Sequence, residues 1–345
     1  MAKRPAFVQE GVDLKPLNTL AIAARATYFA RVSDTDSLRE VLAWQRAASL
    51  PLLLLGGGSN VVLRGDWHGL VLQYGDNTVS LHERDGDDVL VRAGAGVVWH
   101  ELVCYCSAQG WHGLENLALI PGSVGAAPVQ NIGAYGVELD SLVDSVEVVK
   151  LASGMTATLS REQCQFGYRD SVFKNRAAGQ YLITAVTLRL TSQFCPVLSY
   201  PALRDALPCE NPSPQQLIDT VVAVRQSKLP DPARLPNAGS FFKNPVVPAQ
   251  QAAQLLEQYP AMPHYPAAAG QQKLAAAWLI DRAGWRGKAL GPVAMHDKQA
   301  LVLTNPAGGS GAQVLALAER VAQDVLAQFG VALEIEPQCV GGDHG

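Results

Sequence analysis

The hydrophobic pattern of the first 70 residues predicts short strands around one helix. Residues 26–32 are rich in β-forming side chains and predict a strand. A helix is expected to open at residues 35–38, because apolar side chains then recur near helical spacing at Leu38, Val41, Leu42 and Trp44. Its candidate N-caps are Asp34, Thr35 and Asp36. The apolar run at residues 52–55 predicts a buried strand, so we expect a small α/β unit here.

Short alternating segments continue through the middle of the chain and predict further strands. They cover residues 70–74, 79–83, 89–93, 143–151 and 180–190. A helix is expected over residues 97–109, ended by Gly110. This mixture of strands and helices is typical of an α+β domain.

The last third of the chain is expected to contain more helix than the first two thirds. Helices are expected at residues 217–227, 273–282 and 311–329, the last two stopped by Gly284 and Gly330. The apolar stripe of the last helix comprises Val314, Leu315, Ala318, Val321, Val325 and Leu326. A final strand over residues 331–337 is expected to close the chain. A domain break is expected around residues 201–214, where prolines and polar residues accumulate.

Composition limits the function classes. A chain of 345 residues suggests two or three domains, and 48% hydrophobic with 17% charged residues is ordinary for a globular protein. The net charge of −4 and the absence of a long basic run argue against nucleic acid as a partner. No apolar stretch reaches membrane-spanning length. The six cysteines are scattered without a C-x-x-C pair, so we expect reduced structural thiols, no metal site and a cytoplasmic protein.

Two loops of small residues are the strongest functional signal. One is Gly56–Asn60, directly after the apolar run at 51–55, and the other lies within Ile120–Gly136. A lone glycine cluster is usually a turn, but two clusters joined to strand-like segments suggest a dinucleotide wrapped in backbone. The first loop is followed by another strand-like run, Val61–Asp66, and not by a helix, which excludes the Rossmann fingerprint. We therefore expect any phosphates to bind a strand–loop–strand nest.

Three other segments place polar residues unusually. Gly167–Lys174 is either a solvated surface turn or an anion site centred on Arg169, whose planar fork suits a carboxylate. In Asn237–Pro245, Ser240 is either a turn serine beside core phenylalanines or a proton donor fixed in a dry site. Glu334 and Glu336 would share one face of a strand, either in solvent or with one of them lining a cleft and titrating high. Residue spacing alone does not join these segments.

Taken together, these segments resemble the UDP-N-acetylenolpyruvoylglucosamine reductase family of flavoenzymes. The resemblance spans nearly the whole chain and rests on Asn18–Leu20, Leu55–Asn60, Gly113–Glu115, Ile120–Ala126, Tyr168–Ser171, Gly239–Pro245 and Glu334–Pro337. The loop Val197–Tyr200 and an added helical segment around residues 249–266 are similar to the longer, type I branch.

The resemblance implies a particular α+β fold. An FAD-binding module of the vanillyl-alcohol-oxidase (PCMH) type would form two lobes, followed by a C-terminal α/β substrate-binding domain. The expected bounds are residues 1–70 with 331–345 for the first lobe, 71–214 for the second, and 215–330 for the substrate domain.

The resemblance also implies the reaction and its catalytic residues. In this family NADPH reduces FAD, and the reduced flavin then reduces the enolpyruvyl double bond of UDP-N-acetylglucosamine enolpyruvate to give UDP-N-acetylmuramate, a peptidoglycan precursor. By position, Arg169 would stabilise the enolate charge, Glu336 would assist there as a protonated donor or by orienting the enolate, and Ser240 would protonate the other carbon.

The same resemblance implies which residues bind cofactor and substrate. FAD, held non-covalently, would lie along Gly56, Gly57, Gly58, Ser59, Asn60, Pro121, Gly122, Ser123, Gly125 and Ala126. The UDP-sugar would contact Tyr200, Lys228, Asn244, Tyr265, Lys273 and Gln299. Lys228 and Lys273 suit a diphosphate as point charges, although solvated lysines are the alternative, and Tyr200 could anchor a lid.

Other functions remain to be weighed against this one. A flavin oxidase of the same superfamily is the second enzyme hypothesis, but it has no carbanion for Ser240 to protonate. A non-catalytic flavin or sugar-nucleotide binding protein would be expected to lack at least one of Arg169, Ser240 and Glu336, and all three are present. The family resemblance favours a monomer.

Overall fold

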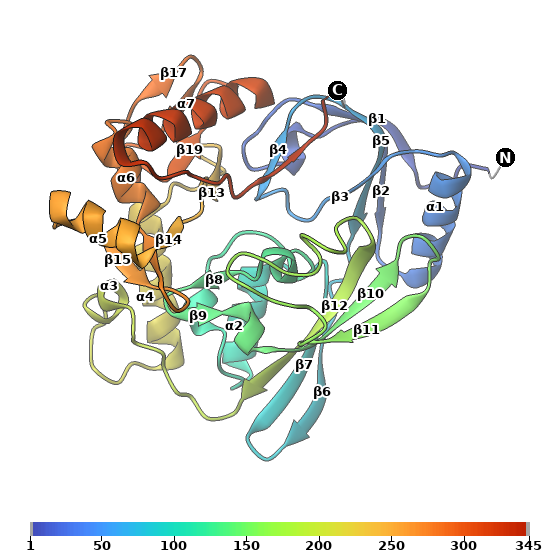
Figure 1. Ribbon diagram of the computed structural model, residues 1–345. Helices are drawn as coiled ribbons and strands as arrows, with labels where there is room; N and C mark the ends of the chain where they lie inside the picture. Colours follow the sequence, from blue (N-terminus) through green and yellow to red (C-terminus); the bar gives the residue numbers. More distant parts are fainter. Residues whose placement is uncertain (1–2, 343–345) are drawn as a thin grey trace. The chain divides into compact units, whose positions relative to one another are not determined.

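The computed structural model describes residues 3–342, whose helices and strands are labelled in Figure 1. The chain divides into two compact units. Unit 1 comprises Met1–Val12, Ala26–Gly57 and His68–Ser227, and unit 2 comprises Asp13–Arg25, Gly58–Trp67 and Lys228–Gly345. Each unit is therefore assembled from three separate stretches of sequence. The division into two FAD-binding lobes and a substrate domain stays a prediction, and the first two and last three residues of the predicted first lobe lie outside the described range.

A four-stranded sheet and one helix form the first layer of unit 1. The strand order is β1 (Gln9–Asp13), β2 (Arg25–Val32), β5 (Trp67–Tyr74) and β3 (Leu52–Leu54). Helix α1 (Thr35–Ala47) buries Leu38, Val41, Leu42 and Trp44 against β2 and β5, as the sequence pattern predicts. Its N-cap is Asp34, whose carboxylate accepts from the amides of Asp36 and Ser37 at 3.1 and 2.8 Å.

A five-stranded antiparallel sheet forms the larger layer of unit 1. The strand order is β11 (Thr156–Ser160), β10 (Val143–Lys150), β12 (Tyr181–Thr191), β7 (Asp88–Gly94) and β6 (Val79–Asp85). The remaining elements are β8 (Gly133–Ala134), β9 (Val137–Glu138), α2 (Trp99–Ala108), α3 (Pro201–Arg204), α4 (Pro214–Lys228) and three short 3₁₀ turns, Glu115–Leu117, Ala127–Gln130 and Leu139–Ser141.

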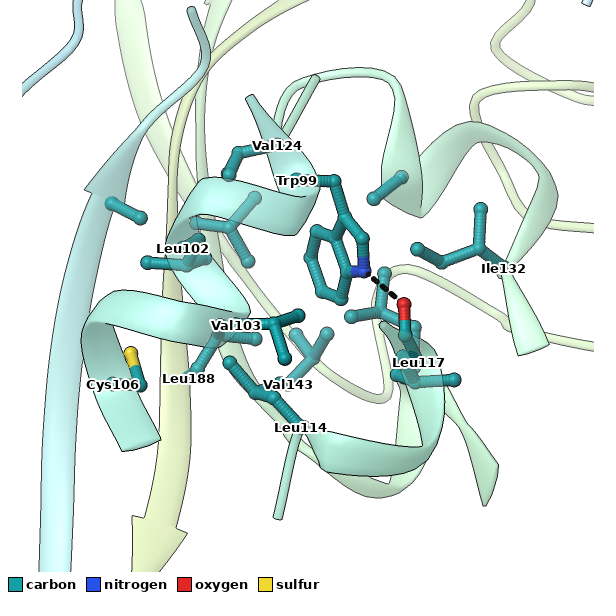
Figure 2. Close-up of a cluster of buried hydrophobic side chains, with 14 of the residues drawn as sticks. Trp99, Leu102, Val103, Cys106, Leu114, Leu117, Val124, Ile132, Val143 and Leu188 are labelled. Carbon is teal, nitrogen blue, oxygen red and sulfur yellow. Dashed lines mark hydrogen bonds between the residues drawn. The ribbon is translucent and has the colours of Figure 1, made fainter. Parts of the chain in front are cut away.

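The core of this layer surrounds Trp99 at the start of α2 (Figure 2). The indole is buried among Leu102, Val103 and Leu117, and its N–H donates to the Leu117 carbonyl at 2.9 Å. Truncating a buried aromatic ring of this kind costs about 3–5 kcal/mol. The start of α2 also supports the small-residue loop that follows the helix, because the backbone amide of Trp99 donates to the Gly122 carbonyl at 3.0 Å.

Up to residue 342, unit 2 contains three small sheets and three α-helices. One sheet has the order β13 (Asn237–Ser240), β19 (Val302–Thr304), β18 (Val293–Met295) and β17 (Ala289–Leu290). A second has the order β14 (Val246–Pro248), β16 (Gln271–Leu274) and β15 (His264–Pro266), and β20 (Gln338–Val340) pairs in parallel with β4 (Val61–Leu63). The helices are α5 (Ala249–Gln258), α6 (Ala276–Arg282) and α7 (Gly311–Phe329), and the 3₁₀ turn Lys15–Leu17 precedes them in the chain.

Three expectations about unit 2 are wrong in detail. Lys273 belongs to strand β16, and helix α6 begins only at Ala276. The strand expected over residues 331–337 is irregular, with a single bridge between Phe242 and Ile335, and the regular strand is β20. In α7, Leu326 is half exposed, whereas Leu317 and Phe329 are buried with Val321 and Val325. Leu326 lies one residue, or about 100° of helix rotation, beyond the buried stripe.

The structure leaves all six cysteines as free thiols. Cys106 and Cys164 are buried in unit 1, but Cys104, Cys195 and Cys209 are exposed, so the expectation that all six serve packing is wrong for these three. Within residues 3–342, every helix falls short of the length and apolar character needed to cross a membrane.

Candidate functional site

Gly56 and Gly57 contact the second small-residue loop within unit 1. A Cβ atom on Gly56 would lie 3.2 Å from Ala126 Cβ and 3.3 Å from Ser123 Oγ. A Cβ atom on Gly57 would lie 3.2 Å from the Cα of Gly122. Since even a methyl group would crowd these contacts, glycine allows the two backbones to approach this closely. Gly56 and Gly57, which are far from the second loop in the sequence, thus lie against it in unit 1.

The second loop is anchored to the segment between β7 and α2. The amide of Val124 donates to the Val97 carbonyl, and the amide of Gly125 donates to the Ala95 carbonyl, both at 2.9 Å. A Cβ atom on Gly125 would lie only 2.5 Å from Ala95 Cβ, closer than real side chains come. These contacts hold the loop in one conformation, which a backbone cradle for a flat or anionic group requires.

The rest of the first loop is tied down within unit 2. Gly58 has φ of +65°, and a Cβ atom there would lie 2.0 Å from the Leu17 carbonyl oxygen. The Gly58 carbonyl accepts from the amide of Thr19 at 3.0 Å, and the Asn60 carbonyl accepts from the amide of Gln338 at 3.0 Å. Gly58 is therefore held by the Asn18–Leu20 segment, which is part of the family resemblance, and Asn60 by the start of β20.

Arg169 lies in a tight turn of unit 1 and is partly buried. Gly167 and Asp170 exchange two backbone hydrogen bonds, at 3.0 and 3.1 Å, so Tyr168 and Arg169 form the tip, with Arg169 at φ of +54°. Its guanidinium donates to the carbonyls of Gly133 and Asn131, at 2.9 and 3.4 Å. The surface turn and the anion site, which the sequence leaves as alternatives, are therefore compatible: the turn carries a guanidinium directed into the protein.

Arg225 of helix α4 is a second cation that sequence reasoning missed. Its Nε donates to the Leu119 carbonyl at 3.2 Å. Burial lowers the pKa of Arg225 most, Tyr135 raises it, and the positive charge of Arg169 lowers it further. Arg225 therefore lies within the electrostatic reach of both residues. The signal was present in the sequence, because Arg225 follows the buried residues Ile218 and Val221 at helical spacing.

Tyr135 and Tyr200 form an aromatic pair beside these cations. Their ring centroids are 5.2 Å apart with the planes at 87°, and burial raises the pKa of Tyr135. Asn116, which is buried, donates its side-chain amide to the Tyr135 carbonyl at 2.9 Å and to the Val197 carbonyl at 2.8 Å. The loop that carries Tyr200 is therefore held against the turn at Tyr135 by one side chain.

Ser240 and Glu336 come together in unit 2 through backbone pairing. Ser240 ends β13, where it pairs with Val302 of β19. The amide of Glu336 donates to the carbonyl of the next residue, Phe241, at 3.0 Å. Phe241 and Phe242 are fully buried, so the core phenylalanines and the serine are parts of one arrangement.

The two glutamates of the C-terminal segment have different surroundings. Glu334 is exposed and forms an ion pair with Lys243. Glu336 is partly buried and follows the bridge at Ile335. Because this segment is not a regular strand, the alternation used to place both glutamates on one face does not hold.

The predicted substrate residues of unit 2 fall into two groups. Tyr265 and Lys273 are directly opposed across β15 and β16, so their side chains share one face of that sheet. Asn244 precedes β14, and its Oδ1 accepts from the Ala276 amide at the start of α6, at 3.0 Å. Gln299 lies in the turn before β19, where its carbonyl accepts from Val302, and Lys228 is the last residue of α4.

The predicted site residues are thus divided between the units. Arg169 and Tyr200 belong to unit 1, as do Gly56, Gly57 and the loop at residues 121–126. Ser240, Glu336 and the remaining predicted residues belong to unit 2. Within each unit the structure gathers residues that are far apart in the sequence.

Two family models match the chain. The model described as "FAD binding domain" matches residues 26–160, and the model described as "UDP-N-acetylenolpyruvoylglucosamine reductase, C-terminal domain" matches residues 231–340. The first range includes both small-residue loops. The second includes Ser240 and Glu336, whereas Arg169 and Arg225 lie between the two ranges.

Comparisons over nearly the whole chain find relatives with the same family name. The chain is 52% identical over 330 residues to the UDP-N-acetylenolpyruvoylglucosamine reductase of Chromobacterium violaceum, covering 94% of this chain and 97% of the relative. It is 49% identical over 340 residues to the enzyme of that name from Azoarcus sp., covering 96% and 98%. Its fold is similar to the crystal structure of UDP-N-acetylenolpyruvylglucosamine reductase from Thermus caldophilus, with a TM-score of 0.68 and 24% identity over 97% of this chain and all of that one.

Proposed function

Because the chain belongs to the UDP-N-acetylenolpyruvoylglucosamine reductase family, we propose that it uses NADPH to reduce UDP-N-acetylglucosamine enolpyruvate to UDP-N-acetylmuramate. The family resemblance inferred from the motifs is confirmed, and so is the α+β fold with an FAD-binding module. The observation that carries the proposal is the 52% identity to a named reductase over 94% of the chain. The proposed reaction belongs to peptidoglycan precursor synthesis in the cytoplasm.

The two small-residue loops fit the FAD that the family implies. The contacts of Gly56 with Ala126 and of Gly57 with Gly122 form a cradle that any larger side chain would fill. We assign Gly56–Asn60 and Pro121–Ala126 to FAD binding, through backbone groups that approach the cofactor closely. When bound, FAD supplies the hydride for the reaction.

Arg169 and Arg225 are suited to the charge that develops on the substrate. Addition of hydride to the terminal carbon of the enolpyruvyl group pushes negative charge onto the neighbouring carbon and its carboxylate. The positive charge of Arg169 disfavours the charged form of Arg225, and an anion bound near Arg225 would offset this effect. Cations fixed before the reaction are the main source of transition-state stabilisation in such steps. Arg169 therefore stabilises the enolate, and we add Arg225 to the residues that hold the carboxylate.

Ser240 and Glu336 complete the reaction in the proposal. Ser240 protonates the carbon that bears the negative charge, which is a base strong enough to accept a proton from a hydroxyl group. Glu336 assists the developing enolate, either as a protonated donor or by orienting it. The pairing of Glu336 with Phe241 supports this assignment, because it fixes the glutamate beside the serine-bearing strand.

The remaining predicted residues bind the UDP-sugar. Lys228 and Lys273 neutralise the diphosphate, and Tyr265, opposite Lys273, provides a ring on the same face of the sheet. Asn244 and Gln299 provide amide groups. Tyr200 closes over the substrate as a lid residue, and its edge contact with Tyr135 gives it a defined resting position.

An anaerobic absorbance experiment on the purified protein tests the proposal. The flavin bands should appear in the spectrum, NADPH should bleach them, and only UDP-N-acetylglucosamine enolpyruvate should restore them. Recovery with oxygen but not with the enolpyruvyl substrate would instead support a flavin oxidase. A protein that cannot be loaded with FAD would contradict the assignment of both loops.

A further inference from the structure

Asn237 lies three positions before Ser240 at the start of β13, and its side chain makes three hydrogen bonds. It is 2% exposed. Its Nδ2 donates to the carbonyls of Pro230 and Leu235, at 3.0 and 2.8 Å. Its Oδ1 accepts from the amide of Gly239 at 2.8 Å. A single buried amide group therefore uses both of its donors and its acceptor on backbone groups.

The bond to Gly239 shapes the backbone that presents Ser240. Gly239 has φ of +68°, and β13 shifts register against β19 between Asn237 and Ser240. Asparagine that accepts a bond from the amide two residues ahead forms an Asx turn, which stabilises a bend of this kind. The bend starts at Asn237, and regular pairing resumes when the amide of Phe241 donates to the Leu301 carbonyl at 2.8 Å. Ser240 is thus held between two fixed points.

The bonds to Pro230 and Leu235 close the proline-rich loop that follows Lys228. Asp231 organises the interior of this loop, because its side chain accepts from Ala233 at 2.9 Å and its carbonyl accepts from Leu235 at 2.9 Å. Asn237 adds the connection from both ends of the loop to β13. Movement of the loop next to Lys228 would therefore disturb the same side chain that bends the strand before Ser240.

We propose that Asn237 is a positioning residue that couples the orientation of Ser240 to the hydrogen-bonded conformation of the loop after Lys228, residues 229–236. The inference rests on the proposed function, in which Ser240 donates the proton and Lys228 binds the diphosphate. It assigns Asn237 no contact with the substrate. Its effect on the reaction is indirect, through the geometry of two groups that must be correctly placed at the same time.

Asn305 provides a closely matched control. It is also an asparagine of unit 2 with 2% exposure. Its Nδ2 donates to the carbonyls of Leu20 and Gly309, and its Oδ1 accepts from the amide of Gly309. Its side chain thus has the same number and kind of hydrogen bonds as Asn237, but none of these side-chain bonds reaches Ser240 or the loop after Lys228. The backbone bond from the Asn305 amide to the Pro236 carbonyl of that loop, at 2.8 Å, is kept when only the side chain is truncated.

The test compares Asn237→Ala, Asn305→Ala and wild type in the FAD-loaded protein. Both variants should lose stability, because each leaves buried backbone groups unpaired. Only Asn237→Ala should lower kcat, by about 10²-fold, which is the effect of misplacing a catalytic group by about 1 Å, and raise KM. An equal loss of kcat in Asn305→Ala would overturn the proposal, because it would show a general effect of destabilisation.

A double-mutant cycle separates positioning from an independent role. If Asn237 acts through Ser240, then Asn237→Ala should cause little further loss of the residual single-turnover rate when Ser240 is already alanine. Full additivity of the two losses would show that Asn237 does not act through Ser240.

Hydrogen exchange tests the same coupling without the reaction. In Asn237→Ala, the hydrogen-bonded loop amides of Ala233, Arg234 and Leu235 should exchange faster than in wild type, and so should the amide of Gly239. In Asn305→Ala they should not. Asn237→Asp keeps the acceptor for Gly239 but removes both donors, so the loop should exchange faster while Gly239 stays protected. Absence of these changes would overturn the coupling. If wild type instead fails to turn over the enolpyruvyl substrate while these changes occur, then the proposed function fails and the coupling stands.

Discussion

Ser240, the proposed proton donor, gives a prediction about turnover that depends on a single hydroxyl group. Its place at the end of β13, beside two buried phenylalanines, restricts its motion and its access to water. Ser240→Ala should keep FAD bound and still be bleached by NADPH, because the substitution removes only a hydroxyl group. Recovery of the flavin bands on adding the enolpyruvyl substrate should then stall, since no proton reaches the substrate. Normal turnover of this variant would show that Ser240 is not the proton donor.

Arg225 offers a second prediction at the residue scale. Arg225→Met should weaken binding of the enolpyruvyl substrate by roughly 10- to 150-fold, which corresponds to loss of a hydrogen-bonded charge worth about 1.5–3 kcal/mol. Titration of the oxidised protein with substrate, followed by the flavin spectrum, measures this affinity.

Arg46→Met is the matched control for Arg225→Met. Arg46 also lies on a helix of unit 1 and donates to a backbone carbonyl, that of Leu151, but at an exposed position. Its loss should leave the substrate affinity unchanged. Similar affinities for both variants would mean that Arg225 supports helix α4 and not the anion.

At the scale of elements, the two small-residue loops give a prediction about the cofactor. Gly57→Ala places a methyl group 3.2 Å from the Cα of Gly122, so the two loops must separate. FAD affinity should fall by about tenfold, or about 1.4 kcal/mol. Gly65→Ala is the control, because a Cβ atom there meets nothing within 4 Å. Fluorescence titration of the apoprotein with FAD measures both, and unchanged affinity in Gly57→Ala would contradict the cradle.

Elements with strong local signals were predicted well. Helix α1 begins after an aspartate that caps it, and α7 ends at a glycine in the left-handed conformation, Gly330, with φ of +64°. Both signals depend on only a few neighbouring residues. The segment 331–337 was mispredicted because its alternating sequence resembles a strand, while in the structure it pairs with residues 241–243 only through isolated bonds. A regular strand needs a neighbouring strand for its backbone hydrogen bonds, and the alternating pattern of residues 331–337 does not identify that neighbour.

For the molecule as a whole, two buried thiols predict how stability responds to alkaline pH. Burial raises the pKa of both Cys106 and Cys164 to about 12. In the unfolded chain these thiols ionise near their ordinary pKa, about 8.5. The stabilisation is therefore complete below that value and is lost as pH rises towards 12, by about 1.4 kcal/mol per pH unit for each thiol.

Urea unfolding between pH 8 and 10.5, with unit 1 followed through thiol labelling, checks this dependence. Cys106→Val should remove about half of the slope that the two thiols cause. Cys195→Ser, at an exposed position, should leave the slope unchanged. An unaltered slope in Cys106→Val would mean that other groups dominate the pH dependence.

The sequence by itself determined the family, the α+β class, the two glycine loops and the residue types that the reaction needs, because these depend on local patterns and on the order of motifs. The tertiary structure decided which of them meet. It joined Gly57 to Gly122 across 64 intervening residues, tied Glu336 to Phe241, and revealed that the charge of Arg169 acts on Arg225. Contacts of this kind form because buried backbone groups and charges need partners, which often come from distant segments. Local sequence patterns do not identify those partner segments.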